Sequence, residues 1–115
     1  MSRAVLLTDG AARDLDELYA AAYDRGGADG ADRFLDRIQV LLTRLADEGS
    51  AGRRLPQLRR LGLDDGRVLR DGDLRIVYRL RQAEARLGEA DALLVLIANA
   101  GRSMQSLLQR RMLED

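Results

Sequence analysis

The residues best suited to chemistry are arginines on a segment predicted to be a β-strand. Over 74–80 apolar and charged residues alternate, so Arg75 and Arg79 share one face of the strand, with Val77 between them. A guanidinium on a rigid strand presents a planar, permanently charged fork that suits phosphate or carboxylate. The same spacing fits the solvated outer face of an antiparallel sheet, so spacing alone leaves both interpretations open.

More arginines flank this strand. Arg67 and Arg70 lie on the β-prone run that precedes it, and Arg102 follows a third apolar run at 92–98. Arg102 stands at a predicted strand-to-helix turn, where backbone N–H groups can point at an anion. An ordinary helix cap by Ser103 explains the same turn equally well. These arginines are the candidate contacts to a phosphate or to a macromolecular target.

The chain offers few groups that could transfer a proton. It contains no histidine, cysteine or lysine, because all 19 basic residues are arginine. This excludes disulfides, thiol nucleophiles, the usual zinc sites, Schiff-base chemistry and Walker-type phosphate loops. Arginine keeps its proton throughout the physiological pH range, so it is a poor acid or base. Tyr78 is expected to face the core, so no nucleophile–base pair can be assembled, and we expect no metal and no cofactor.

Two helices are predicted before these strands, after a short first strand at 4–7. Both carry apolar side chains at helical spacing, and Arg25-Gly26-Gly27 separates them. Two such helices form a hairpin whose apolar side needs cover, so we expect the second helix to pack on the sheet. Its stripe consists of Phe34, Leu35, Ile38, Leu41, Leu42 and Leu45, and that of the first helix of Leu15, Leu18, Tyr19 and Ala22.

The strands follow the helices. Asp71-Gly72 between the runs 67–70 and 74–80 predicts a β-hairpin, and the run 92–98, apolar on both faces, predicts an inner strand. Residues 53–65 are expected to be irregular, and a last helix begins near Ser103. The order β-α-α-β-β-β-α predicts an α+β fold in a single domain over 1–115, with a helical hairpin packed on a small, mostly antiparallel sheet.

The net charge of zero conceals a division of charge along the chain. Residues 1–52 hold 6 arginines against 10 acidic residues, whereas residues 53–81 hold 9 arginines against 4. The basic middle indicates an anionic partner for that segment. No apolar run approaches the roughly 20 residues of a membrane span, and the apolar start is too short for a signal peptide. We therefore expect no membrane contact and a cytoplasmic location.

Several strings, and their order, resemble the RelE/ParE toxin superfamily. They are DLDELY at 14–19, ADRFL at 31–35, GDLRIVYR at 72–79, VLIA at 95–98 and the turn around Gly101-Arg102. The third resembles the family's strand motif G-x-[YF]-R-[IV]-[IV]-Y-R and departs from it at Leu74, where the family often has an aromatic. The resemblance extends over nearly the whole chain. It implies the toxin of a type II toxin–antitoxin pair, a growth inhibitor neutralised by a cognate antitoxin protein.

The target depends on the branch of the superfamily. RelE-like members cut mRNA on the ribosome, and ParE-like members act on DNA gyrase. The ribonucleases use two arginines, which Arg75 and, by position, Arg102 match; Arg67 and Arg70 correspond to basic residues on the preceding strand. The tyrosine or histidine that often assists the RelE-like reaction has no counterpart in 103–115. We therefore favour a ParE-like gyrase inhibitor; the alternatives are a ribosome-dependent mRNA endonuclease and a non-toxic member that only binds antitoxin.

The last predicted helix carries an apolar stripe that could receive the antitoxin. It consists of Met104, Leu107, Leu108 and Met112, and its methionines suit an adaptable surface. We expect an amphipathic antitoxin segment to dock beside this helix and the helical hairpin in a toxin–antitoxin hetero-oligomer. Acidic residues of that segment would reach the basic 53–81 region. Packing of the whole stripe inside the domain is the equal alternative.

Overall fold

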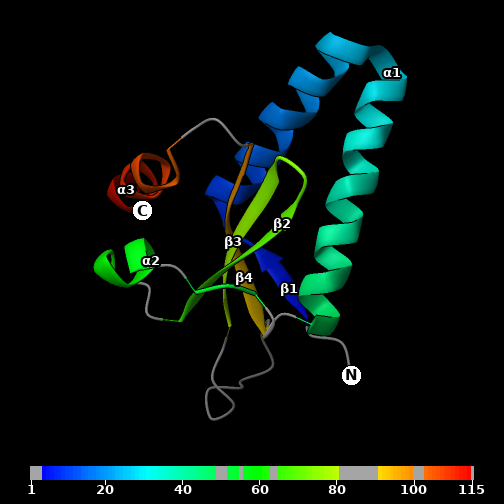
Figure 1. Cartoon of the computed structure of the whole chain (residues 1–115). Coiled ribbons are helices and arrows are strands. Elements are labelled where there is room, and N and C mark those ends of the chain that lie inside the picture. Colours follow the sequence, from blue (N-terminus) through cyan, green and yellow to red (C-terminus); the bar gives the residue numbers. More distant parts are fainter. Residues whose placement is uncertain are drawn as a thin grey trace.

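The fold consists of three layers. A computed structural model describes residues 4–48, 52–54, 56–62, 65–80, 91–99 and 103–114. The side chains of residues 57, 105 and 114 are outside this description. One sheet lies between α1 on one face and α2 and α3 on the other (Figure 1). This is the α+β architecture that the sequence predicts. The elements in chain order are β1 (Val5–Leu7), α1 (Asp9–Glu48), α2 (Pro56–Arg60), β2 (Gly66–Asp71), β3 (Leu74–Leu80), β4 (Ala92–Asn99) and α3 (Met104–Glu114).

The sheet has the strand order β1-β4-β3-β2. β4 is an inner strand, as its two-sided apolar character predicts, and it pairs in parallel with β1 and antiparallel with β3. β2 and β3 form the predicted hairpin, but Asp71 pairs with Leu74, so the turn residues are Gly72 and Asp73 rather than Asp71 and Gly72. Gly72 has a φ of 60°, and glycine at the first turn position is typical of type II′ turns.

α1 is the predicted helical hairpin, two helices that meet at a kink. Gly27 holds the kink with a non-helical backbone (φ 65°, ψ −158°), within the segment predicted to break the helix. The Thr8 hydroxyl accepts a hydrogen bond from the backbone N–H of Ala11 and caps the first half. Because the chain reverses at the kink, both halves lay apolar side chains against the same side of the sheet (Figure 1).

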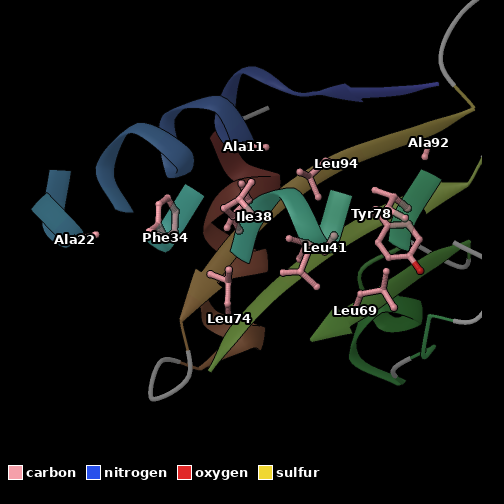
Figure 2. Close-up of a cluster of buried hydrophobic side chains, with 13 residues drawn as sticks. Ala11, Ala22, Phe34, Ile38, Leu41, Leu69, Leu74, Tyr78, Ala92 and Leu94 are labelled. Carbon is pink, nitrogen blue, oxygen red and sulfur yellow. The ribbon is translucent and has the colours of Figure 1, made fainter. Parts of the chain in front are cut away.

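The first core lies between α1 and the sheet. Phe34 and Ile38 of α1 are buried there against Leu74 and Tyr78 of β3 (Figure 2). Leu42 packs at the margin of this core, so the second helix presents the predicted face to the sheet. Each fully buried side chain of this size stabilises the fold by about 1.5–3 kcal/mol, which makes the aliphatic stripe the main anchor of the hairpin.

A second core lies on the opposite face, under α2 and α3. The solvated outer face, one of the two interpretations of the arginine spacing, is therefore wrong in the middle of β3, where Val77 is 0% exposed. The prediction that 53–65 is irregular is wrong for Pro56–Arg60, which form α2. Covering both faces gives the apolar residues on both sides of β3 and β4 a partner. The buried members of this core are Leu58, Val68, Val77, Leu96, Ala98, Met104 and Leu108.

β4 contains a β-bulge. The pairing with β3 passes from Leu94 directly to Leu96, which leaves Val95 without an opposite residue. The extra residue shifts the alternation, because Leu94 and Ile97 face α1 whereas Val95 and Leu96 face α3. In the described part of the chain, no helix has the length and apolarity that crossing a membrane requires.

Candidate functional site

Arg75 lies on the sheet face that α2 and α3 cover. It pairs with Arg70 of β2 and with Ala98 of β4. The residue is half-buried, and its Nε is buried without a hydrogen-bond partner among the described residues. A buried donor without a partner costs free energy, the more so on a charged group. This guanidinium is therefore placed to gain from an anion supplied by another molecule.

Arg70 stands directly opposite Arg75, so two guanidinium-bearing residues share one face of the hairpin. Like charges facing each other across a sheet are destabilising, and an oxyanion bound between the two would remove that cost. The backbone of Arg70 is held, because its carbonyl accepts a hydrogen bond of 2.8 Å from Nη1 of Arg44. Its side chain is exposed, and no described carboxylate lies within ion-pair distance of either Arg70 or Arg75.

Arg79 shares this face, as predicted, but its charge is already compensated. Its Nε lies 3.0 and 3.3 Å from the two carboxylate oxygens of Asp65, at the start of β2. Both partners are partly exposed, so the pair is of the kind that contributes about 0–1 kcal/mol. Of the three arginines on this face of the β2–β3 hairpin, Arg70 and Arg75 are therefore more available to an external anion than Arg79 is.

Two of the predicted arginines are not brought to this face. Arg67 pairs with Tyr78 and so lies on the side of the sheet that α1 covers, where its Nη1 donates to the carbonyl oxygen of Gly52 at 3.0 Å. Arg67 and Arg70 therefore point to opposite faces of β2 and do not act as a pair. Arg102 lies outside the described residues, and its role as a functional arginine after the last strand stays a prediction.

The chain has three tyrosines, and all of them lie on the other side of the sheet from Arg75. Tyr78 is 0% exposed in the first core, and Tyr19 and Tyr23 lie on α1. None of the three hydroxyls is therefore placed to exchange a proton beside Arg75. Within the described segments, no group of three side chains of metal-ligating type comes together either. The sheet face that carries Arg75 therefore has positive charge but no tyrosine that could act as an acid or a base.

A groove of about 80 Å³ lies between the first half of α1, the end of β4 and α3. Its apolar lining includes Leu18, Ile97 and Leu107, and its polar lining includes Glu17 and Asn99. Its position matches the place predicted for the antitoxin, beside the last helix and the helical hairpin. A small groove of mixed lining suits one or two side chains of an extended or helical segment rather than a whole ligand.

The predicted stripe of α3 is divided by the structure. Met104 and Leu108 are 7% and 1% exposed and belong to the second core. Leu107 is partly buried and lines the groove, and Met112 is 45% exposed. α3 begins as predicted, because the hydroxyl of Ser103 accepts a hydrogen bond of 3.2 Å from the backbone N–H of Ser106. Two residues of the stripe thus hold the helix in place and two remain accessible to a partner.

Sequence reasoning missed Arg37, which fastens α1 to the hairpin turn. Nη2 of Arg37 donates to the carbonyl oxygen of Asp71 at 2.7 Å and to Oδ1 of Asp73 at 2.6 Å. This hydrogen bond to Arg37, followed by its positive charge, holds the pKa of Asp73 below its ordinary value. The signal in the sequence was the pair of acidic residues around Gly72, which reads as ordinary turn chemistry.

A helical hairpin covers one face of a four-stranded mixed sheet, and arginines of the β2–β3 hairpin lie on the other face beside α2 and α3. This is the arrangement of the RelE/ParE-type toxins. A solved structure described as the chromosomal ParDE TA system from P. aeruginosa superposes with a TM-score of 0.60 at 19% identity, covering 84% of this chain and 94% of that one. The sequence model of the ParE toxin of type II toxin–antitoxin systems (parDE) matches residues 5–101. The chain belongs to this family and is a type II toxin. No protein with a curated function matches the sequence.

Proposed function

We propose that this toxin arrests growth by binding DNA gyrase and does not cut RNA. The observation that carries the proposal is the separation of Arg75 from the tyrosines: Arg75 lies on one face of the sheet, and Tyr19, Tyr23 and Tyr78 belong to the other. The carboxylate of Asp65 on the face of Arg75 is held by Arg79. Cleavage of a phosphodiester needs a base for the attacking hydroxyl and an acid for the leaving oxygen. Arginine can stabilise the developing charge, but it exchanges no proton near neutral pH.

Arg75 and Arg70 form the centre of the proposed contact. Their guanidinium groups can bind carboxylates on a partner protein as well as phosphates. A partly desolvated arginine is among the side chains that contribute most of the binding free energy of protein interfaces. The exposed Arg70 would steer the encounter, and the half-buried Arg75 would form the shorter and stronger bonds once water is displaced. Gyrase is a cytoplasmic enzyme, so the proposal places the toxin in the cytoplasm.

The antitoxin is proposed to occupy the groove lined by Leu18, Ile97 and Leu107. An apolar side chain of an amphipathic antitoxin segment would enter between α1 and α3 and cover Leu107, while Met112 packs against its flank. The antitoxin then need not touch Arg75 to hold the toxin in a hetero-oligomer. Acidic antitoxin residues that reach Arg70 or Arg75 would in addition block the proposed gyrase contact.

The experiment compares the two target classes on one preparation of toxin. Purified toxin is added to gyrase with relaxed plasmid and, separately, to ribosomes translating a defined mRNA. We expect supercoiling to fall with toxin concentration while the mRNA stays intact, and Arg75→Ala to lose most of the inhibition. Ribosome-dependent cleavage of the mRNA with normal supercoiling would replace the proposal by an endonuclease. Absence of both effects, with antitoxin binding retained, would replace it by a non-toxic family member.

A further inference from the structure

A second basic site lies at the tip of the α1 hairpin, on the opposite side of the sheet from Arg75. A cavity of about 370 Å³ opens there between the two halves of the helix. Its charged lining consists of Arg25, Arg33 and Arg37, and its apolar floor includes Ala22 and Phe34. Neither the proposed gyrase contact nor the proposed antitoxin groove uses these arginines.

Arg37 is held in place before any ligand arrives. Its Nη2 binds Asp73 at 2.6 Å and the carbonyl oxygen of Asp71 at 2.7 Å, and its Nε lies 3.3 Å from the carboxylate of Asp71. The charge of Arg25 also contributes to lowering the pKa of Asp73, which places Arg25 within electrostatic reach of the same turn. One wall of the cavity is therefore a prearranged network of charges, so that less side-chain entropy is lost on binding.

Arg25 and Arg33 are exposed, and neither has an ion pair with a described residue. Asp71 and Asp73 compensate the charge of Arg37, so the positive charge of this cavity that is available to a ligand lies on Arg25 and Arg33. Mutual repulsion of the guanidinium groups is reduced when a single anion enters between them. A monoanion is favoured over a chain of phosphates, because Asp71 and Asp73 beside Arg37 would repel each additional phosphate.

Glycines near the kink allow the two halves of α1, which form the sides of the cavity, to approach each other closely. A Cβ placed on Gly30 would lie 2.9 Å from the carbonyl oxygen of Ala22, so the two halves of α1 meet there at a distance that only glycine allows. A Cβ on Gly26 would approach Nη2 of Arg33 to 3.5 Å. A Cβ on Gly30 would lie 3.8 Å from the same Nη2, so the guanidinium of Arg33 lies beside both glycines, inside the hairpin.

We propose that this cavity binds a carboxylate side chain of an acidic peptide segment in a partner protein, with an apolar neighbour of that side chain resting on the floor. The guanidinium groups of Arg25 and Arg33 donate hydrogen bonds to the carboxylate. Arg37, held by Asp71 and Asp73, forms one side of the cavity. Ala22 lies one helical turn beyond Leu18, which lines the groove beside α3, so both sites follow one face of α1. A segment of the partner that leaves the groove along α1 therefore meets the cavity.

The test uses the whole chain, labelled with ¹⁵N, and the synthetic peptide acetyl-Leu-Glu-Leu-Glu-amide. We expect the peptide to shift the backbone amide signals of Gly26, Gly30 and Phe34, and the peptide with glutamine in place of glutamate to leave them unchanged. Arg25→Gln combined with Arg33→Gln should weaken binding about tenfold or more, since two charge-assisted bonds are lost. Arg110→Gln, the same change at an exposed arginine of α3, serves as the matched control and should bind as the unmodified chain does.

Three results would overturn the proposal. The first is unchanged affinity in the double variant; the second is equal binding of the glutamine peptide. The third is tighter binding of inorganic phosphate or of a thymidine oligonucleotide at the same amides, which would assign the site to phosphate. Because binding is read from the amide signals alone, the outcome is independent of gyrase inhibition and of the antitoxin. Separate single variants, Arg25→Gln and Arg33→Gln, keep the test valid if the double variant fails to fold.

Discussion

Asp14 of α1 and Arg111 of α3 form a two-pronged ion pair that joins the helices on opposite faces of the sheet. Nη2 of Arg111 lies 2.7 Å from Oδ1 of Asp14 and Nη1 lies 3.1 Å from Oδ2, and each side chain is only 13% exposed. Asp14 also accepts a hydrogen bond from the N–H of Ile97, and Arg111 donates to the carbonyl oxygen of Val95. The pair thus covers the edge of β4 beyond the end of β1, at the bulge.

Arg111→Met is expected to destabilise the fold by about 3 kcal/mol, because it leaves the nearly buried carboxylate of Asp14 without its cation. The change keeps an unbranched, flexible apolar stem and removes the charge and the donors. Urea unfolding measures the loss, and Arg110→Met, at the exposed neighbouring position, is the control with an expected change within about 0.5 kcal/mol. Equal stability of the two variants would mean that the ion pair contributes nothing to the attachment of α3.

The close approach of Gly52 to Tyr78 supplies a second stability test. A Cβ on Gly52 would overlap the hydroxyl of Tyr78, which is buried in the first core. Gly52→Ala should therefore cost about 1–3 kcal/mol through overpacking. Combined with Tyr78→Phe, the same change should cost less than it does alone, because the nearest overlapping atom, the hydroxyl oxygen, is gone and Cζ at 2.7 Å remains. Strictly additive effects in this double-mutant cycle would exclude the predicted contact.

The ion pair of Arg37 with Asp73 predicts a dependence of stability on pH. The pKa of Asp73 is lower in the folded chain than its ordinary value, so the stabilisation is complete above about pH 4 and is lost as the pH falls through the lowered value. The side chain of Asp73 is 59% exposed, so the contribution is that of a surface pair, about 0.2–1 kcal/mol. Asp73→Asn should lower the unfolding midpoint near neutral pH, and its difference from the unmodified chain should shrink as the pH falls below about 4. A difference that persists at low pH would assign the effect to the turn and not to the charge.

The sequence predicts the faces of single elements well, because periodicity reports which side of a helix or strand is apolar. Ile38 is buried and Val40 is 51% exposed, as the helical pattern requires. The margins of a stripe are less certain, since Leu35 and Tyr19 belong to the predicted stripes and are 40% and 37% exposed. A stripe spanning more than one helix face includes positions that no neighbouring element reaches.

What periodicity does not report is which faces meet. Val77 interrupts the charged face of β3, and α3 has its own apolar stripe, but only the three-dimensional arrangement shows that each covers the other. α2 is too short for a periodic signal, although Pro56 at its first position is a common start of a helix. The pairing of Asp14 with Arg111 joins residues 97 positions apart, and no local pattern could have indicated it.

Arg75→Ala is expected to abolish growth arrest while the chain stays folded. Arg75 is half-buried with an unpartnered Nε, so removing it takes away the guanidinium proposed to bind the target and costs the fold little. Arg79→Ala should reduce the effect less, because Asp65 already compensates its charge. Induction of each variant from one promoter, with expression checked by immunoblot, gives the comparison. Undiminished arrest by a well-expressed Arg75→Ala chain would remove this residue from the site.

Leu107→Glu is expected to release the toxin from its antitoxin without unfolding it. Leu107 lines the groove between α1 and α3 and is only partly buried, so a charge there meets the incoming apolar side chain of the antitoxin and costs little in the free toxin. The matched change Met104→Glu places the charge in the second core, where the residue is 7% exposed, and should unfold the chain. Co-purification with the protein encoded beside the toxin gene measures binding, and circular dichroism measures folding. A folded Leu107→Glu chain that still binds this partner at full affinity would place the antitoxin elsewhere on the surface.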